Sequence, residues 1–177
     1  MKQTRIPVPR IVWGAALVIW MGVIFSFSAQ TGEESSEMSG GIIQFVAHLL
    51  WKDYDQLSLL EQIQRLNSLT FVIRKCAHFT EYGILAFLAS GFLSTWALTG
   101  KYALGIRMGG AWCFSLLYAV SDELHQMFSD GRSPRAFDVL VDSCGAAAGI
   151  SFFFLMTWIL GKCLYKRETN RYQNSKT

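Results

Sequence analysis

The sequence predicts an all-α integral membrane protein: a four-transmembrane-helix bundle with an amphipathic or interfacial helical segment on its outer side, between helices 1 and 2. Two observations predict this fold. Hydrophobic residues make up 51% of the 177-residue chain and charged residues only 16%, which is poor in charge for a soluble domain. Four stretches also approach the roughly 20 apolar residues that a helix needs to cross a hydrocarbon core about 30 Å thick. The predicted spans are residues 11–27, 77–98, 104–121 and 139–160.

The first span, residues 11–27, contains no charged residue. A cleaved signal peptide is an alternative, because small residues occur between Ser26 and Ala29, but the apolar run is longer than the roughly 7–15 residues of a signal core. The third span is the shortest and requires tilt or local thinning of the bilayer. The second and fourth spans each include one acidic residue near an end, Glu81 and Asp142. We therefore expect four retained spans, two of which carry an acid.

Residues 28–76 form the predicted outer loop between the first two spans. The polar, turn-rich stretch 28–41 predicts irregular structure. The apolar stretch 42–51 is too short to span and indicates an interfacial or re-entrant segment. Between Leu57 and Leu69 apolar residues recur at helical spacing, which predicts an amphipathic helix on the outer surface that continues into the second span.

The distribution of basic residues predicts the orientation. Ten of the sixteen Lys and Arg residues lie in residues 1–10, 99–107 and 162–177, whereas only one acid lies there. Because Lys and Arg near a helix end are retained in the cytoplasm, both termini are expected inside. The chain then divides into a membrane domain, residues 1–161, and a polar cytoplasmic tail, residues 162–177. The net charge of +3 is explained by this bias, so the bilayer is the expected partner and nucleic acid is not.

Polar side chains gather at the outer ends of the last three spans. Arg74, His78 and Glu81 follow an i, i+4, i+7 spacing and share one helix face, and Asp138 and Asp142 are also four residues apart. Each ionisable group costs about 2.5–3.5 kcal/mol at the centre of a membrane helix, so such groups need partners or a function. The candidate cluster comprises Arg74, Lys75, His78, Glu81, Tyr82, Asp122, Glu123, His125, Gln126, Arg132, Asp138 and Asp142.

The fourth span also contains two glycines, Gly145 and Gly149, separated by three alanines. This spacing permits close approach of a neighbouring helix. Packing within the bundle is the preferred interpretation, and dimerisation is the alternative. The oligomeric state is not predicted.

Three polar segments carry a resemblance to a known family. They read Arg74-Lys75-x-x-His78-x-x-Glu81-Tyr82, Tyr118-Ala119-x-Ser121-Asp122-Glu123-x-His125-Gln126 and Arg132-Ser133-x-x-x-x-Asp138-Val139-x-x-Asp142-x-x-Gly145. In their order and spacing they resemble the VanZ-like family, over about residues 13–149. The resemblance implies a multi-pass protein of the bacterial cytoplasmic membrane and a link to antibiotic resistance, namely to lipid-bearing glycopeptides such as teicoplanin. It implies no mechanism.

The preferred functional hypothesis is an outward-facing polar pocket that binds an envelope lipid, a peptidoglycan precursor or the glycopeptide itself. Phosphate or carboxylate groups would be held by charge-assisted hydrogen bonds. The basic residues available for this role are Arg74, Lys75, Arg132 and Arg135.

Two alternatives stay open. A membrane-embedded, metal-dependent hydrolase could act on an envelope substrate, since His, Glu and Asp side chains are zinc ligands. Its candidate metal ligands are His78, Glu81 and His125, with Asp122 and Asp142 as further donors. No His-Glu-x-x-His sequence is present, so zinc remains an alternative cofactor, no catalytic residue is assigned, and the sequence does not decide whether the protein is an enzyme. In the second alternative the cluster is a salt-bridge network that only joins the helices.

Overall fold

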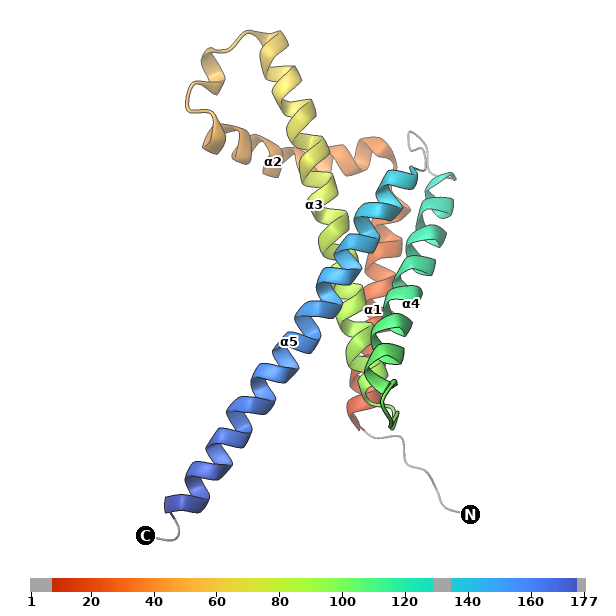
Figure 1. Ribbon diagram of the computed structural model, residues 1–177. Helices are drawn as coiled ribbons and strands as arrows, with labels where there is room; N and C mark the ends of the chain where they lie inside the picture. The colour runs from red at the N-terminus through yellow and green to blue at the C-terminus, as the bar shows by residue number, and fades with distance from the viewer. Residues whose placement is uncertain (1–7, 129–134, 175–177) are drawn as a thin grey trace.

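Four long apolar helices form the body of the protein (Figure 1). The computed structural model describes residues 8–128 and 135–174, and this part contains no strand. The helices long and apolar enough to cross a membrane are α1 (Val8–Ser28), α3 (Leu59–Ser94), α4 (Ala103–Gln126) and α5 (Ala136–Asn174). The predicted all-helical, four-span fold is therefore confirmed.

Two helices differ in extent from the predicted spans. α4 has 24 residues and continues to Gln126, so the third span is long enough to cross without unusual tilt. α3 has 36 residues and joins the predicted amphipathic segment to the second span in one helix, as expected. α5 also continues through most of the predicted tail, to Asn174. Each boundary lies beyond the apolar run because polar residues can extend a helix outside the hydrocarbon core.

The prediction of irregular structure over residues 28–41 is wrong for most of that stretch. Helix α2 (Gly32–Leu50) begins there, after a capping box. The Thr31 hydroxyl accepts from the Glu34 N–H at 3.2 Å, and the Glu34 carboxylate accepts from the Thr31 N–H at 2.8 Å. The bond that the Glu34 carboxylate accepts from the Thr31 N–H, and a second one from the Thr31 hydroxyl, lower the pKa of Glu34 below its usual range. The reciprocal pair satisfies two of the donors that a helix start leaves unpaired, which offsets the poor helix propensity of Gly and Ser.

α2 lies across one end of the bundle and packs on α3 around residues 66–73, beyond the first turns of that helix (Figure 1). Ile43 and Ala47 of α2 form a small apolar core with Leu69 of α3 and with Tyr54 of the short 3₁₀ helix η1 (Tyr54–Gln56). The segment between α1 and the later turns of α3 is therefore a packed helical hairpin. α1 begins and α5 ends at the opposite end of the molecule.

His48 connects α2 to η1 and makes this contact sensitive to pH. Its Nδ1 lies 2.8 Å from the Gln44 carbonyl oxygen and its Nε2 lies 3.1 Å from Asp55 Oδ1. Only a protonated imidazole donates from both nitrogens, and these bonds, that to Gln44 first, raise the pKa of His48 above its ordinary value.

Because the folded-state pKa of His48 is raised, its stabilising effect is full below about pH 6.5 and disappears as pH rises through the raised value. We expect hydrogen exchange of the α2 amides, corrected for intrinsic rates, to accelerate relative to the bundle over that interval. The substitution His48→Gln should remove the pH dependence. An α2 protection that stays constant across the interval would contradict this assignment.

The bundle core closes around a tight crossing of α3 and α5. A Cβ added at Gly145 would meet the Phe79 carbonyl, and one added at Gly149 would meet the Gly83 carbonyl. Gly145 and Gly149 therefore serve packing inside the chain, which confirms the preferred interpretation of their spacing. Beyond this crossing α5 diverges from the other helices (Figure 1).

Candidate functional site

The polar cluster lies at the end of the bundle that α2 covers, where α4 ends and α5 begins. Four of its carboxylates are buried, and they lie on helices that are otherwise apolar. Asp142 is fully buried, and the other buried polar members are Asp122, Glu123, Gln126 and Asp138. Charges in such a position require close partners, because desolvation of each ion is costly.

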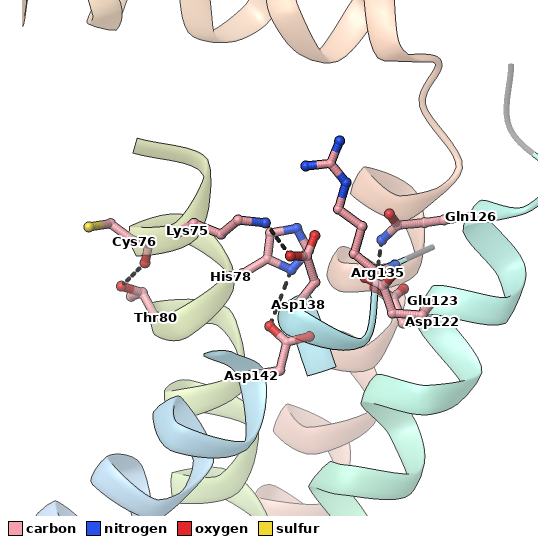
Figure 2. Close-up of polar contacts among 10 residues, drawn as sticks. All are labelled: Lys75, Cys76, His78, Thr80, Asp122, Glu123, Gln126, Arg135, Asp138 and Asp142. Carbon is pink, nitrogen blue, oxygen red and sulfur yellow. Dashed lines mark hydrogen bonds and ion pairs between the residues drawn. The ribbon is translucent and has the colours of Figure 1, made fainter. Parts of the chain in front are cut away.

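Two contacts between basic and acidic side chains join α3 to α5 (Figure 2). Lys75 Nζ contacts Asp138 Oδ1, and one turn further along His78 Nδ1 lies 3.2 Å from Asp142 Oδ1. The i, i+4 pair of acids on α5 thus faces a basic residue in each successive turn of α3.

The remaining acids of α4 are held by amide groups. Gln126 Nε2 donates to Asp122 Oδ2 at 3.0 Å along α4 itself. The backbone N–H of Arg135 donates to Glu123 Oε2 at 2.8 Å, while the exposed Arg135 guanidinium points away from the carboxylates (Figure 2). The start of α5 is therefore fixed to the end of α4 by a charge-assisted hydrogen bond.

Several predicted cluster residues lie outside these pairs. His125 faces α1, with Nδ1 3.3 Å from Ser28 Oγ and its ring 4.4 Å from that of Phe25. Tyr82 is fully buried in the bundle core, beside Tyr118. Arg132 lies outside the described residues.

A cavity of about 160 Å³ opens beside the pairs, between the end of α1, the start of α2 and the facing sides of α3 and α4. Predicted cluster residues supply much of its polar lining, namely Arg74, His78, Glu81, Asp122 and Gln126. The apolar lining includes Ile24, Phe27, Ile73 and Ala77. The cavity is large enough for several water molecules or a small polar group.

One wall of this cavity was not predicted from the sequence. Gln30, Ser35, Met38 and Ser39 contribute it from the connection after α1 and from the first turns of α2. They were overlooked because residues 28–41 read as irregular loop. The Thr31-x-x-Glu34 capping box was the available signal for a helix there.

One imidazole and two carboxylates converge beside the cavity. His78, Glu123 and Asp142 each offer one possible metal-ligand atom, and these atoms all lie within 4.8 Å of one another. Of the metal donors proposed from the sequence, His78 and Asp142 are in this group, whereas Glu81, Asp122 and His125 are not. Glu123 and His125 are two residues apart, so they project about 160° apart around α4, and the packing turns Glu123 toward α5.

The fold and the site together define a polytopic helical membrane protein with a buried, internally paired polar cluster at one end of its bundle. The sequence profile of the VanZ/LLP1 family matches residues 13–158, which include every position of the cluster. The chain belongs to this family. No curated protein and no solved structure was found that matches the chain.

Proposed function

We propose that the cavity beside the polar cluster binds the anionic headgroup of an envelope lipid or lipid-linked peptidoglycan precursor. Under this proposal the cavity opens at the outer face of a bacterial cytoplasmic membrane, an orientation that the positive-inside bias of the sequence supports. Occupancy of the cavity by such a molecule, or by the antibiotic, would contribute to resistance to lipid-bearing glycopeptides such as teicoplanin. The observation that carries the proposal is that the Arg74 side chain lines the cavity without a partner among the described residues.

Arg74 lines the cavity, and its side chain makes no hydrogen bond or ion pair with the residues that the structure describes. The neighbouring basic groups are engaged differently, Lys75 with Asp138 and His78 with Asp142. A guanidinium group presents a planar fork of donors that matches phosphate or carboxylate in a bidentate geometry. An anionic ligand would thus satisfy the one arginine of the cavity lining.

The rest of the lining suits an amphipathic ligand. Hydroxyl groups of Ser28, Ser35 and Ser39 and the amide of Gln30 border the cavity on one side. Gln30 Oε1 is buried without a hydrogen-bond partner among the described residues, so a ligand hydroxyl could donate to it. The apolar remainder of the lining can contact the first methylene groups of a lipid chain.

A metal-dependent hydrolase is the second candidate function. It is favoured by the convergence of His78, Glu123 and Asp142, a donor set that can hold zinc. The cavity borders His78, so a headgroup bound there would lie beside this set. Binding and catalysis therefore share one location, and turnover of a bound lipid would distinguish them.

The substitution Arg74→Gln is expected to weaken binding of short-chain phosphatidylglycerol to the purified protein by about tenfold or more, because a charge-assisted hydrogen bond contributes about 1.5–3 kcal/mol. Binding would be measured by titration in a nonionic detergent, with zwitterionic phosphatidylcholine as the comparison ligand. Arg65→Gln is the matched control, since Arg65 lies on the same helix but stacks on Trp51, outside the cavity. Parent-like affinity in Arg74→Gln would contradict the proposal.

The same variants separate binding from a purely structural role in cells. If the proposal holds, Arg74→Gln removes teicoplanin protection in an expressing host while the amount of protein in the membrane stays at the parent level. A fall in abundance that parallels the loss of protection would instead favour the salt-bridge network as the function of the cluster.

A further inference from the structure

We propose that His78, Glu123 and Asp142 form a buried site for a divalent metal ion of the zinc class. The inference does not depend on headgroup binding, because Glu123 and Asp142 do not line the cavity and His78 is the one ligand that borders it. It is carried by the geometry of the three side chains, by two buried carboxylate oxygens and by the charge balance of the cluster.

The three ligands come from three helices that the bundle holds together. His78 is on α3, Glu123 on α4 and Asp142 on α5, and one possible ligand atom from each lies within 4.8 Å of the others. Zinc ligands about 2.1 Å from the metal in tetrahedral geometry are about 3.4 Å apart, so closure requires movements of about 1 Å. Side-chain rotation supplies such movements without displacing a helix. Three protein ligands with one open position are the usual arrangement of a catalytic zinc site.

Two of the three ligands carry an oxygen that the fold leaves unsatisfied. Asp142 uses Oδ1 for His78 and Glu123 uses Oε2 for the Arg135 N–H. Their second oxygens, Asp142 Oδ2 and Glu123 Oε1, are buried and have no hydrogen-bond partner in the described part of the chain. A buried acceptor without a partner is expensive, and an unpartnered carboxylate oxygen more so. A single cation between Glu123 and Asp142 would give both of these oxygens a partner.

The charge balance also favours a cation. Four carboxylates of the cluster are buried, whereas Lys75 is the one basic side chain other than histidine that forms an ion pair with any of them in the described ranges. A metal with two positive charges would neutralise the negative charges of Glu123 and Asp142, neither of which has a lysine or arginine partner among the described residues. One imidazole and two carboxylates are borderline-to-hard donors, a set that suits zinc or manganese rather than copper(I).

Zinc chloride alone is the probe. The purified protein would be stripped with EDTA, exchanged into metal-free detergent buffer and titrated calorimetrically, followed by elemental analysis. We expect about one zinc ion per chain and a higher midpoint of thermal unfolding with zinc than without it. Glu123→Gln and Asp142→Asn should each weaken zinc binding at least tenfold.

Two controls occupy neighbouring positions on α4. His125→Gln removes the other histidine of the cluster, and Asp122→Asn alters a buried carboxylate that already has an amide partner. Both should bind zinc as the parent does. Absence of zinc binding by the parent, or binding retained in both Glu123→Gln and Asp142→Asn, overturns the site. So does a loss in His125→Gln as large as in those variants.

The visible spectrum of Co²⁺ bound to the parent keeps the proposal testable if a variant fails to fold. Intense bands typical of four- or five-coordinate Co²⁺ with a nitrogen donor, displaced by equimolar zinc, are expected. The weak spectrum of hydrated Co²⁺ would overturn the proposal. Neither measurement contains a lipid, so failure of zinc binding and failure of headgroup binding are read separately.

Discussion

Replacing Gly149 by leucine is expected to destabilise the protein by about 3 kcal/mol or more, the upper range for forcing extra atoms into a packed interior. A Cβ at this position already meets the Gly83 carbonyl of α3, and that atom belongs to the backbone and cannot rotate away. The variant can relieve the overlap only by moving α5 from α3. Because α5 carries Asp138 and Asp142, the same movement would separate both ion pairs of the site. Denaturant titration in detergent would measure the stability change.

Gly161 provides the matched control on the same helix. A Cβ there has no atom within 4 Å, so Gly161→Leu should leave the free energy of unfolding close to that of the parent and gain slightly from helix propensity. Equal stability losses at positions 149 and 161 would show that the crossing of α3 and α5 does not hold the bundle together. A loss confined to Gly149→Leu would show that this crossing positions the site.

The four spans could be predicted because a membrane helix is recognised from a local property of the sequence, a long uninterrupted apolar run. α2 could not be predicted in the same way. Its first turns are rich in Gly and Ser, which do not favour a helix in isolation. The helix exists because Thr31 and Glu34 cap it and because Ile43 and Ala47 find an apolar surface on α3, a contact that composition does not show.

Most of the residues that form the candidate site could be predicted from the sequence, but their arrangement only in part. The i, i+4 spacing of Asp138 and Asp142 anticipated two acids on one side of α5. The rotation of α4 about its axis is a tertiary property, so the sequence did not reveal that Glu123 faces α5 while His125 faces α1. The predicted metal set consequently included His125 in the place that Glu123 occupies.

The substitution Lys75→Met is expected to cost about 3 kcal/mol or more, the usual result of leaving one member of a buried ion pair without its partner. The side chains of Lys75 and Asp138 each expose less than a fifth of their surface to solvent, so water replaces little of the lost interaction. The double variant Lys75→Met, Asp138→Leu should recover part of this loss, because it removes the stranded charge as well. A double-mutant cycle by denaturant titration would then give a coupling energy of about 1–3 kcal/mol.

The exposed pair His48 and Asp55 is the control for this cycle. At least half of each side chain is exposed to solvent, so water screens the interaction. Measured above the raised pKa of His48, where the imidazole is neutral, it should show little or no coupling. Coupling at Lys75 and Asp138 no larger than at the control would mean that the pair does not join α3 to α5. If the double variant is stable and still binds zinc and phosphatidylglycerol, the pair is structural, and the binding functions belong to Arg74 and the His78 group. The cycle therefore separates the part of the cluster that holds the helices from the part that is free to act.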